Sequence, residues 1–93
     1  MELERDVENY LIHQVKQMNG LTYKWVSPGI RGVPDRIVIL AGKLFFVELK
    51  RANGSLRKNQ QYQIRKLREQ GQLVFTVYSK ADVDQVLNKI FNE

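Results

Sequence analysis

Two short apolar runs joined by a three-residue link constrain the fold of this chain more than any other feature. The runs are IVIL and LFFV, and Ala-Gly-Lys joins them. Runs of this length rich in β-branched and aromatic residues predict strands, and so short a link predicts an antiparallel hairpin. We therefore expect strands at Arg36–Leu40 and Lys43–Lys50. Each has an acidic residue near its outer end, Asp35 before the first strand and Glu48 in the second.

The turn decides which residues of this hairpin face each other. If Ala41 and Gly42 form a two-residue turn, residues whose numbers sum to 83 are partners, and Asp35 then faces Glu48. Directly opposed residues have Cβ atoms about 4.5–5.5 Å apart. Because side chains alternate along a strand, Lys50 projects to the same face as Glu48. A register shifted by one residue would instead place the two acids on opposite faces of the sheet.

Two carboxylates and one ammonium group at one place have two interpretations. Directly opposed acids repel each other, and a divalent cation between them relieves the repulsion. Mg²⁺ is typically held by one or two carboxylates together with water and phosphate oxygens. Alternatively, Asp35 merely ends a Pro-Asp turn, while Glu48 and Lys50 lie on the solvated face of an edge strand. From this pattern alone, both interpretations stay open.

The rest of the chain divides into helices and strands around the hairpin. Helical spacing of apolar residues, strand alternation and capping residues predict five further elements: helices over 3–18 and 57–69, strands over 21–26 and 72–78, and a last helix from the Ser79 cap to about Phe91. The helix before the final strand makes a crossover, so the last two strands should be parallel. We expect one domain over 1–93, of α/β class, with helices packed on a mixed sheet.

Charge and composition narrow the classes of partner. The net charge is +5, and residues 21–80 carry +9 while residues 1–20 and 81–93 carry −2 each. This positive segment favours a polyanion such as nucleic acid, although a solvated basic face on an ordinary small protein explains it equally well. The absence of cysteine excludes disulfides and thiolate metal sites. No signal-peptide pattern or membrane-length apolar run is present, so we expect a cytoplasmic protein without a membrane partner.

A spaced set of residues around the hairpin resembles a known family. The pattern is Gly32-Val33-Pro34-Asp35, then twelve residues, then Glu48-Leu49-Lys50, followed by Gly54, Leu56 and Gln60. It resembles the PD-(D/E)xK nuclease superfamily and, within it, the VRR-NUC branch, whose small stand-alone members occur in phages and bacteria. The resemblance covers residues 3–78 and implies a restriction-endonuclease-like αβββαβ core, here followed by a C-terminal helix. It implies an endonuclease that uses Mg²⁺ or Mn²⁺ and acts as a homodimer on branched DNA such as Holliday junctions.

The resemblance also implies roles for individual residues. Asp35, Glu48 and the backbone carbonyl of Leu49 would hold the metal ion. Lys50 would position or help to deprotonate the attacking water and stabilise charge in the transition state. Two further residues would assist: Gln60 by orienting the water or the lysine, and Glu8 on the first helix by supporting the metal site.

Helical spacing supports the last two assignments. Gln60 shares a stripe with Ile64 and Leu67, and Glu8 flanks the apolar face that contains Leu11 and Val15. Each assignment has an alternative that the sequence does not exclude. Gln60 can be an ordinary polar residue at a helix start, and Glu8 an exposed acid that is favourable near a helix N-terminus.

Residues in and beside the loops that precede the first hairpin strand and follow the second are candidates for contacts to the DNA phosphate backbone. They are Ser27, Arg31, Arg36, Arg51, Arg57 and Lys58. Contacts to phosphates set affinity and orientation rather than sequence preference. Each basic residue can equally be ordinary solvated charge. Tyr23 and Trp25 lie on the same face of the predicted strand over 21–26. Three roles are open for them: stacking on bases, a dimer contact or, most commonly for such residues, packing in the core.

Two classes of function besides a complete nuclease stay open from the sequence. One is a DNA- or RNA-binding module that keeps the fold and the charge without catalysis. The other is a nuclease subunit of a larger repair or restriction assembly. The triplet Asp35, Glu48 and Lys50 argues against the first of these.

Overall fold

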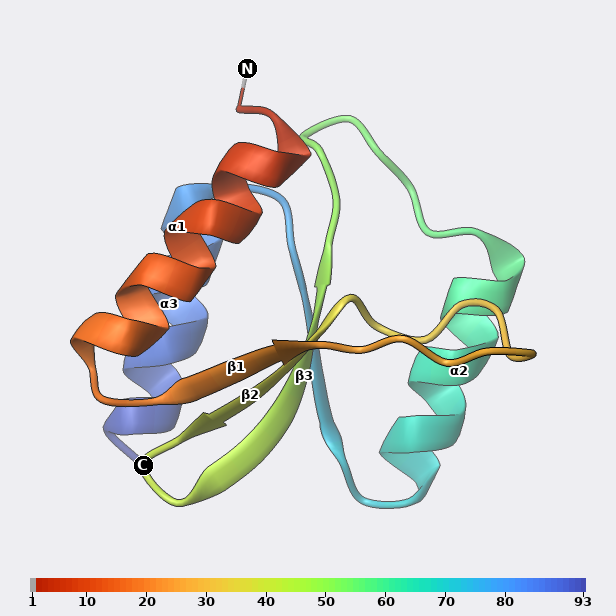
Figure 1. The fold of residues 1–93 in the computed structure, drawn as a ribbon. Helices are drawn as coiled ribbons and strands as arrows, with labels where there is room; N and C mark the ends of the chain where they lie inside the picture. Colours follow the sequence, from red (N-terminus) through yellow and green to blue (C-terminus); the bar gives the residue numbers. More distant parts are fainter. Residues whose placement is uncertain (1) are drawn as a thin grey trace.

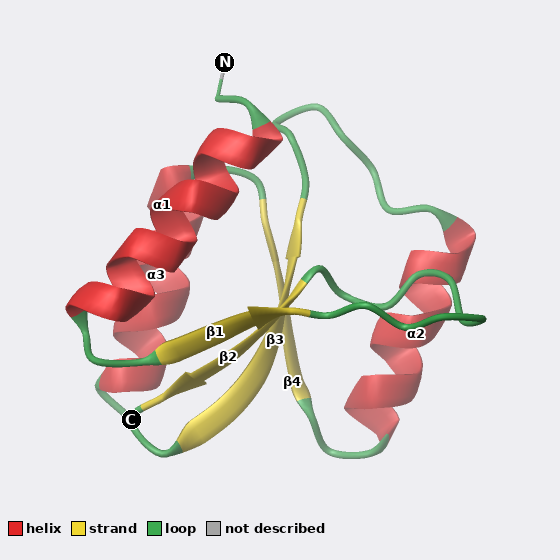
Figure 2. Ribbon diagram, viewed as in Figure 1, coloured by secondary structure: helices red, strands yellow, loops and turns green. Residues whose placement is uncertain are grey.

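The computed structural model describes residues 2–93 as a four-stranded sheet with helices on both faces (Figures 1 and 2). The elements in chain order are α1 (Glu4–Gln17), β1 (Leu21–Lys24), β2 (Arg36–Leu40), β3 (Lys43–Leu49), α2 (Lys58–Glu69), β4 (Leu73–Val77) and α3 (Lys80–Phe91). Every predicted element is present, with bounds that differ from the prediction by at most two residues. The predicted class, a mixed sheet packed by helices, is confirmed.

The sheet has the strand order β1-β2-β3-β4. β1 pairs with β2 and β2 with β3 in antiparallel orientation, whereas β3 and β4 are parallel. The parallel pair is joined through α2, as the crossover pattern predicted. In Figure 1 the chain leaves β3 through a long loop, descends through α2 and returns along β4.

The turn between β2 and β3 is the two-residue turn on which the predicted register depends. Ala41 has φ 53° and Gly42 has φ 78°, and tight hairpin turns of type I′ need positive φ at both central residues. The pairs then run from Leu40 opposite Lys43 to Arg36 opposite Val47. The predicted register of the hairpin is therefore confirmed.

The helices form two layers, one on each face of the sheet. α1 and α3 lie side by side on one face, and α2 lies alone on the other (Figure 1). The larger core lies beneath α1 and α3 and includes Val7, Leu11, Val15, Val38, Phe45, Leu87 and Ile90. The smaller core, on the α2 face, contains Phe46, Ile64 and Val74, with Trp25 and Ile37 packed against them. Side-chain alternation places Asp35 and Glu48 on this second face.

The end of α1 differs from the prediction in one detail. Gly20 lies just after the helical pattern of residues 3–18 and is predicted from the sequence as its C-terminal cap, but Asn19 is the residue with left-handed backbone, at φ 62°. Gly20 still takes part in closing the helix, because its N–H donates to the Val15 carbonyl oxygen at 2.8 Å, and a Cβ atom there would lie 2.9 Å from the carbonyl oxygen of Ile39. The glycine lets the chain turn closely past β2. Among residues 2–93, no helix combines the length and apolar character needed to cross a membrane.

Candidate active site

The three residues Asp35, Glu48 and Lys50 meet where β2 begins and β3 ends. One step beyond the last registered pair, the hairpin places Asp35 opposite Glu48. Asp35 Oδ2 accepts a hydrogen bond of 2.8 Å from the backbone N–H of Leu49, which ties this carboxylate to β3. Lys50 Nζ lies 3.8 Å from Glu48 Oε2. The sequence-predicted grouping of two acids and one amine is therefore present.

Glu48 is almost completely enclosed, with 1% of its surface exposed. Its Oε2 atom accepts a 2.8 Å hydrogen bond from Gln60 Nε2, whereas its buried Oε1 atom has no hydrogen-bond partner among the described residues. Burial raises the pKa of Glu48 from 4.5 to about 8, the neighbouring Asp35 carboxylate adds to the rise, and Lys50 opposes it. An unpaired buried oxygen is costly in free energy unless something positive approaches it.

Gln60 connects the site to the N-terminus of α2. Its Oε1 atom accepts a 2.8 Å hydrogen bond from the backbone N–H of Arg57, while its Nε2 atom donates to Glu48. Both ends of the amide are therefore bonded, which fixes its orientation. The inward stripe predicted for this helix is confirmed, because Ile64 is buried and Leu67 packs against the same core.

Gly32 lets the loop before Asp35 pack directly on α2. Its φ is +92°, and a Cβ atom at this position would lie 2.4 Å from the carbonyl oxygen of Asn59. No side chain fits in that space. The loop that delivers Asp35 and the helix turn that delivers Gln60 are thus in backbone contact, so the two halves of the site are positioned together.

These residues fit a divalent cation whose shell is completed from outside the chain. Residues 2–93 contain no group of three or more His, Cys, Asp or Glu side chains arranged to hold a metal. They do offer two carboxylates, with one buried Glu48 oxygen that lacks a partner. Hard cations such as Mg²⁺ take oxygen ligands and commonly use one or two carboxylates plus water and phosphate oxygens.

Glu8 does not join this cluster in the structure. Its Oε2 atom pairs with Arg36 Nη1 at 3.1 Å, and Arg36 Nε donates to Thr22 Oγ1, also at 3.1 Å. Arg36 is only 9% exposed, so this pair links α1 to the start of β2 rather than facing solvent. The roles assigned from sequence to Glu8 as a metal support and to Arg36 as a DNA contact stay predictions.

The other predicted DNA contacts lie on the two loops and at the start of α2. Arg31, Arg51, Arg57 and Lys58 are exposed, and Ser27 is half-buried. Of the two aromatic residues in question, Trp25 stacks against Phe46 with ring centroids 5.1 Å apart, whereas Tyr23 is 53% exposed. Of these two residues, Trp25 therefore belongs to the core and Tyr23 does not.

Two polar residues near the site were not singled out from the sequence. Thr76 on β4 pairs in register with Glu48, and Asn59 has a buried Oδ1 atom without a partner among the described residues. The sequence did not predict that Thr76 lies beside Glu48, because the register between β3 and β4 depends on the path of the long crossover that joins them. Asn59 carried one signal, its position directly before Gln60 at the helix start.

Comparison with known proteins finds relatives in both structure and sequence. A solved structure described as "VRR_NUC domain" has a TM-score of 0.87 and 31% sequence identity, covering 95% of this chain and 97% of that chain. A protein of Acyrthosiphon pisum secondary endosymbiont phage 1, named "Putative nuclease p44", is 52% identical over 48 residues, which make up 50% of this chain and 52% of that protein. The match thus spans about half the length of this curated relative. No protein-family model matches the chain.

Proposed function

The chain belongs to the VRR_NUC family, and from that premise we propose that it is an endonuclease that uses a divalent cation to hydrolyse phosphodiester bonds in DNA. The observation that carries the proposal is the meeting of Asp35, Glu48 and Lys50, with one enclosed Glu48 oxygen that has no partner among residues 2–93. The relative named as a nuclease supports the same activity.

We propose Mg²⁺ or Mn²⁺ as the cation, held by Asp35, Glu48 and the backbone carbonyl of Leu49. A bound divalent cation supplies Lewis-acid chemistry, because it withdraws charge from a phosphate oxygen and acidifies water. The Leu49 N–H bond to Asp35 and the Gln60 bond to Glu48 orient the two carboxylates. Such outer contacts typically affect metal affinity or activity by about 10–100-fold when they are lost.

Lys50 has the position and charge to act on the reacting phosphate. Hydrolysis of a phosphodiester builds up negative charge on the phosphate oxygens, and a fixed positive group beside them stabilises the transition state. The Lys50 amine approaches Glu48 Oε2 from the same face of the sheet. In our proposal it positions the attacking water and stabilises this charge, and the products carry 3′-hydroxyl and 5′-phosphate ends.

Basic residues around the site supply the attraction to DNA. Arg57 caps α2 and Lys58 begins it, and the first turn of this helix contains no acidic residue. Positive side chains and a helix N-terminus both favour phosphate groups. We propose that Arg31, Arg51, Arg57 and Lys58 contact the backbone on either side of the scissile bond.

We further propose that the protein acts as a homodimer on branched DNA in the cytoplasm. One short chain offers one site, whereas resolving a four-way junction takes two coordinated cuts, which a two-fold symmetric dimer supplies. The sheet also has apolar surface to cover, because Leu21 and Leu44 are 53% and 46% exposed in one row across β1, β2 and β3. Sedimentation of the isolated chain should give twice the mass of one chain, and a monomer at all concentrations would contradict this part of the proposal.

The activity is tested by cleavage of a supercoiled plasmid and of a synthetic four-way junction. We expect cleavage with Mg²⁺ or Mn²⁺, none in EDTA, and a loss of at least about 100-fold in Lys50→Ala, as for removal of one charge-stabilising group. Lys89→Ala is the matched control, because this lysine lies on α3 in the other helical layer. Tight DNA binding without cleavage under any condition would favour the non-catalytic binding module instead.

A further inference from the structure

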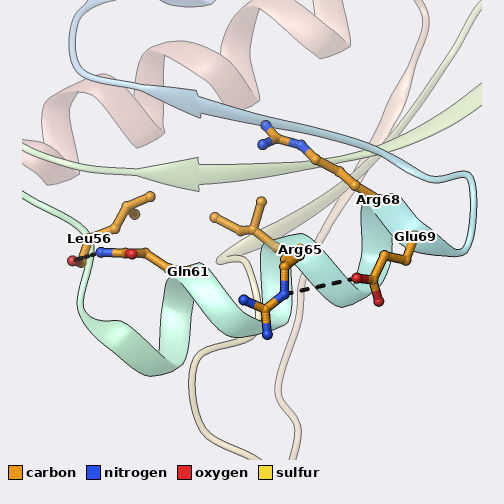
Figure 3. Close-up of a pocket in the computed structure, with 6 residues that line it drawn as sticks. Leu56, Gln61, Arg65, Arg68 and Glu69 are labelled. Carbon is orange, nitrogen blue, oxygen red and sulfur yellow. Dashed lines mark hydrogen bonds and ion pairs between the residues drawn. The ribbon is translucent and has the colours of Figure 1, made fainter.

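A pocket of about 430 Å³ opens beside α2 (Figure 3), and Asp35, Glu48 and Lys50 do not line it. It is lined by Leu56, Gln61, Ile64, Arg65, Arg68 and Glu69. By helical geometry this side of α2 is roughly opposite Asn59, where the Gly32 loop packs. The pocket is therefore separate from both the metal cluster and the loop contact.

The pocket is lined by apolar side chains and by polar side chains that hydrogen-bond to backbone carbonyl oxygens. Leu56 and Ile64 supply the apolar part, and Gln61 Nε2 donates to the Leu56 carbonyl oxygen at 2.9 Å. Arg68 Nη2 donates to the Val74 carbonyl oxygen at 2.7 Å, which fixes that arginine against β4. In Figure 3 Arg68 extends from α2 toward the strand, whereas Arg65 extends away from it.

Arg65 is the residue best placed to receive a planar ligand. Its guanidinium carbon lies 5.2 Å from the centre of the Tyr62 ring, so the aromatic ring restrains the guanidinium plane. Its ion pair with Glu69 is long, at 3.9 Å, and its side chain is 63% exposed. Exposed pairs of this kind contribute little to stability, so the guanidinium is available for a further contact at small cost.

We infer that this pocket binds one unpaired nucleobase of the DNA substrate. Aromatic rings and arginine guanidinium planes are the usual stacking partners of splayed-out bases, apolar side chains also enclose such bases, and stacking tolerates any base. The volume falls in the range of about 300–1,000 Å³ that is common for sites binding small organic groups. Arg57, Lys58 and the two pocket arginines make this side of the molecule complementary to the charge of a nucleic-acid strand.

The position of the pocket connects it to the proposed reaction, and the inference rests on that proposed function. Gln61 follows Gln60, whose amide bonds to Glu48, and Leu56 lies in the loop that leaves Lys50. Arg68 is eight residues beyond Gln60, about 12 Å along a helix that rises 1.5 Å per residue. A base held here belongs to nucleotides close to the scissile bond, and a branched substrate supplies unpaired bases that plain duplex lacks.

Binding is tested by NMR on the whole chain in EDTA, with two trinucleotide probes. One is a thymidine trinucleotide, and the other has the same phosphates and sugars without bases. We expect the thymidine probe to shift the Ile64 methyl signals and the abasic probe to leave them unchanged. Equal shifts from both probes, or shifts confined to residues around Lys50, would show charge attraction alone and overturn the inference.

Two pocket variants and one control sharpen this measurement. Arg65→Ala and Leu56→Ala should each weaken thymidine-trinucleotide binding, by about 10-fold for loss of one stacking contact. Lys66→Ala removes the same charge from the next residue, which does not line the pocket, and should leave the Ile64 shifts unchanged. Similar weakening in all three variants would contradict a base-specific site.

A cleavage assay separates this inference from the proposed function. Arg65→Ala should lower cleavage of a branched substrate more than cleavage of a nicked duplex, and Lys66→Ala should not change that ratio. An unchanged ratio in Arg65→Ala would overturn the link between pocket and substrate choice. If the wild-type chain cleaves nothing, the proposed function fails, while the trinucleotide test still decides whether the pocket binds a base.

Discussion

Glu48 is the residue at which folding and the proposed chemistry conflict most clearly. Its carboxyl group is enclosed, one of its oxygens has no partner in the described structure, and Asp35 faces it. A chain selected only for stability would gain by placing an apolar residue at this position, because an unsatisfied buried polar group costs about 1–3 kcal/mol. This cost is consistent with the proposed role of Glu48 as a ligand of a divalent cation.

The raised pKa of Glu48 predicts how stability depends on pH in the metal-free protein. The pKa is about 8 in the folded chain against 4.5 for an ordinary glutamate, so between these values the folded state holds a proton that the unfolded state has lost. The free energy of unfolding should then fall as pH rises from about 5 to 8, and level off above that. Calorimetry in EDTA across this range measures it. Glu48→Gln should flatten the slope, and an unchanged slope in this variant would exclude Glu48 as its cause.

A second residue-scale prediction concerns the ion pair between Glu8 and Arg36. These side chains are 26% and 11% exposed, so removing one partner leaves a charge poorly solvated. Glu8→Ala should lower the free energy of unfolding by about 2 kcal/mol, less than the roughly 3–5 kcal/mol for breaking a fully buried pair, because both side chains keep some solvent contact. Urea unfolding in EDTA measures this. If Glu8 instead acts mainly on the metal, the variant will lose Mn²⁺ affinity while its stability is unchanged.

At the scale of elements, the site depends on the contact between the loop before β2 and the first turn of α2. The loop carries Asp35, the helix carries Gln60, and Gly32 is the point where the two backbones touch. This explains why the site can be formed by elements far apart in the sequence. Their relative position is set by backbone packing rather than by long flexible side chains.

Substituting Gly32 should therefore affect activity beyond its effect on stability. In Gly32→Ala the new Cβ atom would meet the Asn59 carbonyl at 2.4 Å, so α2 must shift and the Gln60 bond to Glu48 should break. Gly29→Ala is the matched control, because Gly29 is in the same loop at φ +84° with nothing within 4 Å. Both variants should lose about 1 kcal/mol to backbone strain. Only Gly32→Ala should also lose most of its activity, and equal activities in the two variants would contradict the packing argument.

At the scale of the whole molecule, the basic side chains of α2 lie on the same face of the sheet as the proposed site. Residues 57–68 contain five basic side chains and no acidic one, and α2 covers the sheet face that carries Asp35 and Glu48. The layer of α1 and α3 on the other face is mixed in charge, with Glu4 and Asp6 in the first turn of α1. The molecule is thus polarised so that DNA is attracted toward the face with the site.

This polarity predicts the salt dependence of DNA binding. Each phosphate contact contributes about 0.9 to the slope of log K against log salt concentration. Arg57→Ala and Lys58→Ala should each reduce that slope by about 1, whereas Lys89→Ala on α3 should leave it unchanged. Anisotropy titrations of a labelled duplex over a range of salt concentrations measure the slopes. Equal slopes for all three variants would show that DNA does not approach from the α2 side.

Much of this architecture could be predicted from local rules. The hairpin register followed from Ala41 and Gly42, since one tight turn fixes every pair, and it brought Asp35 opposite Glu48. The sequence does not show what long-range contacts decide. Asn19 rather than Gly20 takes the left-handed conformation, and no sequence pattern shows the close approach of Gly20 to β2. The pairing of Glu8 with Arg36 and the exposure of Tyr23 likewise depend on how helices and strands pack together.

The central claim is that Asp35 and Glu48 together hold a divalent cation. Crystals grown or soaked with Mn²⁺ and measured at the manganese absorption edge test it most directly. We predict an anomalous peak about 2.0–2.2 Å from an oxygen of each carboxylate, at the distances of a compact oxygen-ligated cation, and its loss in Glu48→Gln. A structure with Mn²⁺ in the solution and no peak between these two side chains would contradict the claim.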